Sequence, residues 1–199
     1  PDDLFGSAPQ IQAKLGAKNA VAFDLTAACS GFLFALVTAA QFVQTGSMKR
    51  VLVVGADQLS RWVDWDDRRS CVLFGDGAGA IALESTNADD DGLIGFKWKS
   101  DGSRGDYLNL HQTQDSLPLV EGITHQKGGF SSIQMNGQEV YKFAVKEVPI
   151  ILGQLLDKYQ IESERIDWLL LHQANQRILD AVAARFLIPS RKVLSNLEH

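Results

Sequence analysis

The segment from Val21 to Phe32 places a cysteine between a short apolar run and a long apolar segment. Val21–Leu25 has the character of a strand, and Gly31–Val43 has the length of a helix and contains no proline. Cys29 is therefore expected where a buried strand turns into a buried helix. Because the first amides of a helix lack intrahelical partners and carry positive partial charge, we expect them to lower the pKa of Cys29 below about 8.5.

Small residues flank this cysteine and leave room for a substrate to reach the sulfur: Ala27, Ala28, Ser30 and Gly31. Taken alone, the segment leaves two interpretations open, a nucleophile that becomes acylated or a structural cysteine in a helix entry made of small residues. The second cysteine, Cys71, lies in an apolar run that predicts a strand. It is better interpreted as a thiol of the core.

The same arrangement of strand, polar turn and helix is predicted a second time. Val51–Val54 is a continuous apolar run, typical of a strand covered on both faces of a parallel sheet, and with Val21–Leu25 it predicts a βαβ unit. Trp168–Leu171 predicts another buried strand, followed by His172 and a helix over Gln176–Leu187. Side chains at the carboxyl ends of buried parallel strands point into the crevice where α/β proteins bind ligands.

The glycine-rich run Gly75–Ala80 formally fits a dinucleotide-binding fingerprint with alanine in the last place. That fingerprint has to open a helix after a strand, whereas Ile81–Glu84 is typical of a strand. We therefore expect strands over Cys71–Phe74 and Ala78–Leu83 around a glycine hairpin, Gly75–Gly77, that packs beside the site.

The polar run Asn87–Gly92 predicts a boundary between two halves, 1–86 and 87–199. Gly92–Ser132 carries many turn signals, so short strands and loops are expected there. Asn136 is expected to cap the first turn of the helix that follows.

Charge, hydropathy and cysteine usage exclude several classes of protein. The net charge of -5 argues against a general nucleic-acid binder. The longest apolar segment is shorter than the roughly 20 residues that a membrane span needs, and the chain opens without the basic and apolar pattern of a secretory signal. Two cysteines make neither a disulfide framework nor a metal set, which favours a reducing cytoplasm and predicts no metal site.

Cys29 and His172 form the strongest chemical pair, because an imidazole near a thiol can take its proton or donate to an oxyanion. The alternative for His172 is a histidine at a strand end that is hydrogen-bonded to the backbone. The other histidines lie in polar, turn-rich surroundings and are expected to be exposed: His111, His125 and His199.

Two groups of basic residues have a functional and an ordinary interpretation. Arg68 and Arg69 follow three carboxylates and two tryptophans. This stretch is either a solvated loop or the entrance of a binding site for a nucleotide or phosphate. Around the last predicted helix, positive charge forms either a solvated face or a docking surface for an acidic partner. Its members are Arg177, Arg185, Arg191 and Lys192.

Five motifs together resemble the β-ketoacyl-acyl-carrier-protein synthase III family, condensing enzymes of the thiolase-like superfamily that start type II fatty acid synthesis. They are Ala27–Phe32, Phe74–Ala80, Ser100–Ser103, Met135–Val140 and His172–Ile178. The resemblance implies an α/β fold, a layered thiolase-like arrangement of two related halves with mixed β-sheets and buried helices. Residues 1–86 would belong to the amino-terminal half with the nucleophile, and 87–199 to the carboxyl-terminal half with the catalytic histidine.

The resemblance also implies roles for single residues. Cys29 matches the nucleophile that takes an acetyl group from coenzyme A, and His172 matches the histidine that stabilises the enolate formed when malonyl-acyl-carrier-protein loses carbon dioxide. Arg68 matches the arginine beside the adenine of coenzyme A, and Arg177 a residue that docks the acidic carrier protein. Asn175 belongs to the histidine motif and is not the catalytic asparagine. The resemblance implies no cofactor beyond these substrates, and it implies a homodimer.

In the family, the catalytic asparagine follows just past the position of His199, and a further segment precedes that of Pro1. We therefore expect this chain to be the middle of a longer enzyme. Two alternatives stay open: a condensing enzyme like the type III polyketide synthases, which uses no carrier protein, and a non-catalytic scaffold that binds acyl chains or carrier protein.

Overall fold

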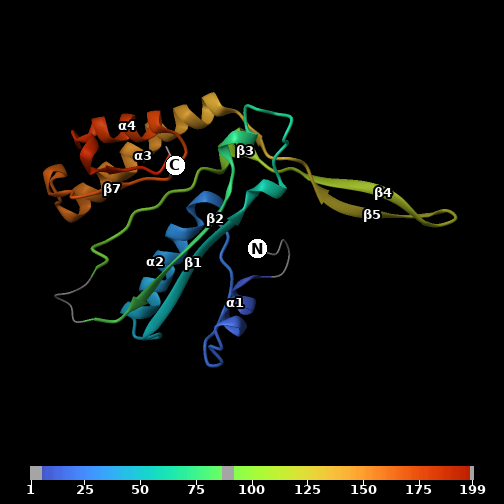
Figure 1. The fold of residues 1–199 in the computed structure, drawn as a ribbon, viewed down its shortest axis with the longest axis horizontal. Helices are drawn as coiled ribbons and strands as arrows, with labels where there is room; N and C mark the ends of the chain where they lie inside the picture. Colours follow the sequence, from blue (N-terminus) through green and yellow to red (C-terminus); the bar gives the residue numbers. More distant parts are fainter. Residues whose placement is uncertain (1–5, 87–91, 198–199) are drawn as a thin grey trace. The chain divides into compact units, whose positions relative to one another are not determined.

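The computed structural model describes residues 6–86 and 92–197, shown in Figure 1. The chain divides into two compact units. Unit 1 comprises Pro1–Leu59 and Gly75–Ile94, and unit 2 comprises Ser60–Phe74 and Gly95–His199. The expected boundary falls mostly on residues 87–91, which lie outside the described residues, and the halves 1–86 and 87–199 stay a prediction.

Among its described residues, unit 1 contains two α-helices and one antiparallel pair of strands. Helix α1 covers Ala8–Lys14 and helix α2 covers Gly31–Gln44, close to the predicted helix. Strand β1, Arg50–Gln58, pairs with strand β2, Asp76–Glu84, in an unbroken antiparallel register. Helix α2 lies along β1 (Figure 1), and their contact buries small and β-branched side chains: Val37, Ala39, Ala40 and Val53.

The predicted parallel βαβ unit is wrong for the described residues. Val21–Leu25 forms no strand there, since a strand needs a neighbour for its backbone groups. Val21 and Phe23 are accordingly 75% and 58% exposed. The partner of β1 is the antiparallel β2, and only one face of β1 is covered, because Val53 is buried while Leu52 is 49% exposed.

The predicted glycine hairpin is also wrong. Cys71–Leu73 is a turn of 3₁₀ helix (η3), and Asp76 and Gly77 already belong to β2, opposite Gln58 and Asp57 of β1. An apolar run of four residues cannot by itself distinguish a strand from a helical turn. Here the Ser70 carbonyl accepts from the amide of Leu73, which closes the turn at 2.9 Å.

The core of unit 2 is built by two helices and a short parallel pair of strands. Helix α3, Gly137–Tyr159, begins at Asn136, whose side chain accepts from the Glu139 amide at 3.3 Å, as predicted. Helix α4, Gln176–Arg185, packs against α3, and strand β7, Leu169–Leu170, pairs with β8, Val193–Leu194. The buried cluster consists of Leu169, Ile178, Val182, Ala183 and Ile188.

The strand predicted over Trp168–Leu171 is therefore reduced to β7. Leu169 is 6% exposed, whereas Trp168 and Leu170 on the other face are 62% and 69% exposed. This strand is covered on one face among the described residues, and it was expected to be buried on both.

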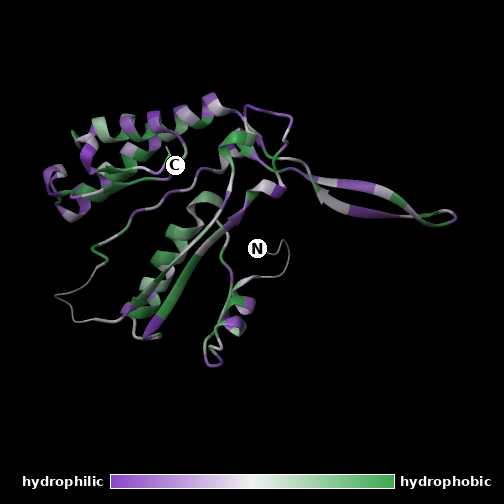
Figure 2. Ribbon diagram, viewed as in Figure 1, coloured by the Kyte–Doolittle hydropathy of each residue, from purple (hydrophilic) through white to green (hydrophobic). Residues whose placement is uncertain are grey.

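A long hairpin occupies part of the region where only short strands and loops were expected. Strand β4, Gln112–Val120, pairs with β5, Ile123–Phe130, through a connection closed by Gly122 with φ of +77°. Figure 2 shows that the hairpin is largely polar along its length and apolar at its tip. Before and after it, β3, Leu108–Asn109, pairs with β6, Gln134–Met135.

The serine–aspartate–glycine motif near residue 101 begins the 3₁₀ segment η5, Gly102–Tyr107. The Asp101 carboxylate accepts from the amide and the hydroxyl of Ser103 and pairs with Arg104 at 3.1 Å. Arg104 and Lys99 also contact the buried Glu147 of α3, at 3.5 and 3.0 Å. Hydrogen bonding from Lys99, above all, lowers the pKa of Glu147, so this motif fixes η5 to α3 through charge pairing.

Candidate active site

Cys29 lies on a sharp turn at the start of α2. The 3₁₀ segment η1, Ala28–Ser30, runs directly into the helix. Ala28 has φ of +46°, a conformation that costs free energy for a residue with a Cβ and that is often found at functional sites. Cys29 is exposed, whereas Cys71 is buried, as predicted. The turn therefore presents the Cys29 sulfur at the surface of unit 1.

The electrostatics of this thiol differ from the expectation. Partial burial of the sulfur against neighbouring protein atoms is the main cause that raises the pKa of Cys29, and the negative charge of Asp57 raises it further. A hydrogen bond from the backbone of Cys29 itself acts in the opposite direction and is weaker. The prediction of a lowered pKa is wrong because it considered neither the partial burial of the thiol nor the carboxylate of Asp57 at the end of β1.

His172 follows β7 after one residue, Leu171, and is exposed. Its carbonyl oxygen accepts from the Ala174 amide at 2.9 Å, which closes the turn after the strand. Asn175 is the N-cap of α4, since its side-chain oxygen accepts from the Arg177 amide at 2.8 Å. This contact gives Asn175 the role of a helix cap, in agreement with its exclusion as the catalytic asparagine.

Gln173 is a residue of this site that the sequence analysis missed. Its side-chain amide donates to the carbonyls of Leu171 and Leu194 at 2.9 and 3.1 Å, and its side-chain oxygen accepts from the Asn196 amide at 3.0 Å. These three hydrogen bonds tie the turn after β7 to the end of β8. The sequence signal that could have identified Gln173 is its position next to His172 in the motif. Its hydrogen bonds fix the backbone that carries His172.

Arg68 lies in the loop between η2, Leu59–Arg61, and η3. The neighbouring Arg69 pairs with Asp67 at 2.8 Å, and hydrogen bonding from Arg69 lowers the pKa of Asp67 to about 2. Arg68 is exposed and makes no ion pair within the part of the chain that the structure describes, and Trp65 is 65% exposed. An arginine charge and an indole are thus available to a ligand in this loop.

The basic residues around α4 separate into different environments. Arg177 and Arg185 are exposed at the two ends of the helix. Lys192, in the 3₁₀ segment η7 (Ser190–Lys192), donates to the carbonyls of Glu164 and Ile166 at 3.3 and 2.5 Å, which fixes the preceding 3₁₀ segment η6 (Ser163–Arg165).

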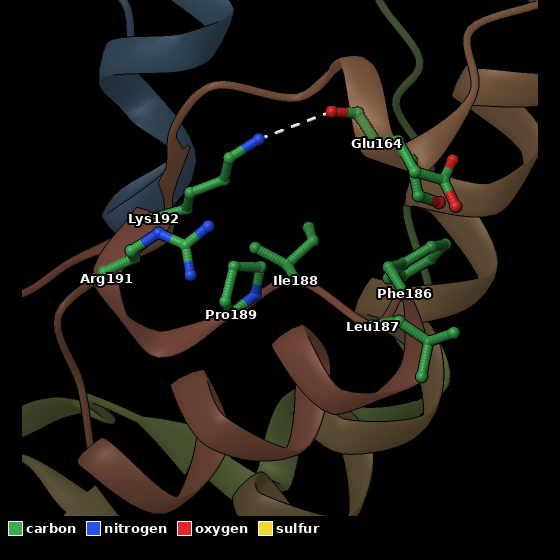
Figure 3. Close-up of a pocket in the computed structure, with 8 residues that line it drawn as sticks. Glu164, Phe186, Leu187, Ile188, Pro189, Arg191 and Lys192 are labelled. Atoms are coloured by element: carbon green, nitrogen blue, oxygen red, sulfur yellow. Dashed lines mark hydrogen bonds between the residues drawn. The ribbon is translucent and has the colours of Figure 1, made fainter.

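Figure 3 shows Lys192 and Arg191 beside a cavity of about 180 Å³ next to the carboxyl-terminal end of α4. The carbonyl contacts of Lys192 indicate a structural role, so the predicted docking surface is reduced to the three arginines: Arg177, Arg185 and Arg191.

The predicted site residues are divided between the two units. Cys29 belongs to unit 1, and Arg68, His172 and Arg177 belong to unit 2. The pairing of Cys29 with His172 stays a prediction. His111 and His125 are exposed, as predicted, and His199 lies outside the described residues.

Comparison with known proteins identifies the family. A family model described as 3-Oxoacyl-[acyl-carrier-protein (ACP)] synthase III matches residues 23–102, and the model of its C-terminal part matches residues 156–199. The chain belongs to this family. The matched ranges contain Cys29, Arg68, His172 and Arg177. The family match does not favour the alternative of a type III polyketide synthase.

Relatives and solved structures support the same conclusion. A Beta-ketoacyl-[acyl-carrier-protein] synthase III from Prochlorococcus marinus strain MIT 9313 is 75% identical over 197 residues, which cover 99% of this chain and 58% of the relative. Structures of 3-oxoacyl-(acyl carrier protein) synthase III from Pseudomonas aeruginosa PAO1 and of the corresponding synthase from Thermus thermophilus are each 34% identical. Their TM-scores are 0.83 and 0.85, with 98% and 100% of this chain and 58% and 60% of the other chain covered.

The synthase III structures confirm the predicted α/β, thiolase-like class of fold. The chain spans about 58% of the length of the Prochlorococcus relative. Among residues 6–86 and 92–197, no helix is both long and apolar enough to cross a membrane, and no cluster of three or more potential metal ligands occurs.

Proposed function

We propose that the protein is a condensing enzyme that starts type II fatty acid synthesis. In the first step Cys29 attacks the carbonyl of acetyl-coenzyme A, a new bond joins the sulfur to the acetyl group, and coenzyme A leaves as its thiol. In the second step malonyl-acyl-carrier-protein loses carbon dioxide. The resulting carbanion attacks the acetyl-Cys29 thioester and releases 3-oxoacyl-carrier-protein.

The observation that carries this proposal is the turn at Cys29 in a chain of the synthase III family. Cys29 is an exposed residue at the start of α2, after a residue with positive φ, and its partly buried sulfur is open to a thioester from solvent. The N-cap residues of η1 and α2, Ala27 and Ser30, make no side-chain capping bond, which suits amides that meet a developing oxyanion. Cys71 is buried and lacks this access.

His172 is proposed to stabilise the enolate of the second step. The turn that carries it is held by Gln173 and Asn175, which limits how far the imidazole can move. Fixed donors at the site of developing charge are worth about 100- to 1000-fold in rate each. A preorganised histidine fits that requirement.

Arg68 and Arg177 are proposed to bind the two substrates. Arg68, with the exposed Trp65 nearby in the same loop, has the chemistry to contact the adenine and phosphates of coenzyme A. Arg177 is exposed at the start of α4 and would attract the acidic carrier protein.

The test is a condensation assay with acetyl-coenzyme A and malonyl-acyl-carrier-protein, with detection of 3-oxoacyl-carrier-protein and carbon dioxide. We expect product from the full-length enzyme that contains this chain and none from its Cys29→Ala variant. The segment 1–199 by itself should not complete the condensation, because the expected catalytic asparagine follows it. Malonyl-coenzyme A in place of the malonyl carrier protein should be a poor extender. Efficient use of malonyl-coenzyme A would indicate a polyketide synthase-like enzyme, and the absence of product with both extenders would favour a non-catalytic scaffold.

A further inference from the structure

One face of β1 points toward the start of α2. The register between β1 and β2 is unbroken from Arg50 to Gln58, so side chains alternate strictly between the two faces of the pair. Val53 is buried and lies on the face that α2 covers. Gly55 and Asp57 lie on the same face, two and four residues further along the strand.

The contact at Gly55 shows which part of α2 this face meets. A Cβ built on Gly55 would come within 3.2 Å of the Phe32 ring and within 3.5 Å of the Phe32 Cβ. Phe32 lies in the first turn of α2, immediately after η1, which contains Cys29. The missing side chain of Gly55 therefore lets the start of α2 approach β1 closely, and the next residue on that face is Asp57.

We propose that Asp57 is a positioning residue whose carboxylate faces the Cys29 turn across the contact between β1 and α2 and, together with the partial burial of the sulfur, disfavours the thiolate. This role deepens the proposed function, on which it rests, since it concerns the nucleophile of the acyl transfer. Burial of the thiol is the larger cause of the raised pKa of Cys29, and the negative charge of Asp57 raises it further, in the direction that this geometry predicts.

The other carboxylates close to this region of unit 1 are engaged elsewhere. Asp76 is paired with Gln58, so it lies on the opposite face of the β1–β2 pair. Asp24 accepts from the amides of Ser7 and Ala8 at 3.0 and 2.9 Å, at the start of α1. Asp57 is the carboxylate that acts on the Cys29 thiol among the described residues.

A neutral resting thiol suits an exposed nucleophile. Oxidation and alkylation act on the thiolate, and susceptibility rises with exposure. In the acyl transfer the Cys29 proton passes to the coenzyme A thiolate as it leaves, so the charge of the site is the same before and after the step. A thiolate of higher pKa is also the stronger nucleophile when it forms. Asp57 would thus limit side reactions without preventing acylation.

The test is the pH profile of Cys29 alkylation by iodoacetamide, measured by peptide mass spectrometry on the folded protein from about pH 6 to about pH 10. We expect Asp57→Asn to move the midpoint to lower pH and to accelerate alkylation at neutral pH. Asp76→Asn removes the same charge from the opposite face and serves as the matched control. Its midpoint should stay at the wild-type value.

Salt gives a second measurement that needs no variant. Because Asp57 is exposed, raising the salt from about 50 mM to about 500 mM should screen its charge and lower the wild-type midpoint, while Asp57→Asn should respond less. An unchanged midpoint in Asp57→Asn, or equal shifts in both aspartate variants, would overturn the inference. Acetylation by acetyl-coenzyme A is scored separately, so that failure of the proposed function is distinguished from failure of this role.

Discussion

Two helices, α2 and α4, begin shortly after predicted reactive residues, Cys29 and His172. The backbone and side chains at these two helix starts differ. At Cys29 the start of the helix is made of small residues, Ala28 adopts a positive φ, and the N-cap residue Ser30 makes no side-chain capping bond. At His172 side chains hold the start of the helix. Asn175 accepts from the Arg177 amide of α4, and Gln173 donates to the carbonyls of Leu171 and Leu194.

This difference fits two kinds of chemistry. A nucleophile needs access for a bulky thioester and free amides that can meet an oxyanion. A histidine that stabilises an enolate needs a fixed position more than an open surface. The small residues at Cys29 and the capping residues at His172 provide these two properties through the same succession of turn and helix.

The largest effect should come from removing the His172 imidazole, before the start of α4. His172→Ala should reduce decarboxylation of malonyl-acyl-carrier-protein by about 100- to 1000-fold, because a fixed donor to the enolate is lost. Acetylation of Cys29 should persist. Release of carbon dioxide and mass spectrometry of the acetyl adduct measure the two steps independently. Loss of both steps to the same extent would contradict the division of roles.

The next prediction compares how much the N-cap residues of α4 and α2 contribute to stability. Asn175→Ala should destabilise the protein by about 1 kcal/mol, since an amide of α4 loses its acceptor. Ser30→Ala should change stability by no more than about 0.5 kcal/mol, because the Ser30 side chain makes no capping bond. Denaturant unfolding followed by circular dichroism gives both values. Similar losses for the two variants would show that the two helix starts do not differ as described.

A smaller effect is expected at the surface near the start of α4. Arg177→Ala should raise the KM for malonyl-acyl-carrier-protein by up to about fivefold and weaken its salt dependence, because an exposed basic residue steers an acidic partner. Lys127→Ala, an exposed lysine of β5, is the control and should change neither value. An equal loss with malonyl-coenzyme A as extender would assign Arg177 a structural role instead.

Local signals in the sequence predicted the helices well. The apolar segment after Cys29 predicted α2 nearly at its observed bounds, and Asn136 predicted where α3 begins. The helix expected over Gln176–Leu187 is α4, Gln176–Arg185. Both helix starts with asparagine depend on contacts two or three residues away, and such contacts are visible in a pattern.

Properties that depend on distant partners could not be predicted. Val21–Leu25 has the composition of a strand, yet strand pairing needs a neighbour that composition does not reveal. The antiparallel pairing of β1 with β2, the long β4–β5 hairpin and the charge of Asp57 beside Cys29 are of this kind. The Gln173 hydrogen bonds join the turn after β7 to β8, which is also a non-local contact.

The most direct test of the central claim is to map the acetyl group after the protein has been incubated with acetyl-coenzyme A. Because Cys29 is exposed at the start of α2, we expect one acetyl adduct, on the peptide that contains Cys29. We expect none on the peptide that contains the buried Cys71. Cys71→Ser should retain the adduct and Cys29→Ser should lose the thioester. An adduct on Cys71, or no adduct on a folded protein, would contradict the account.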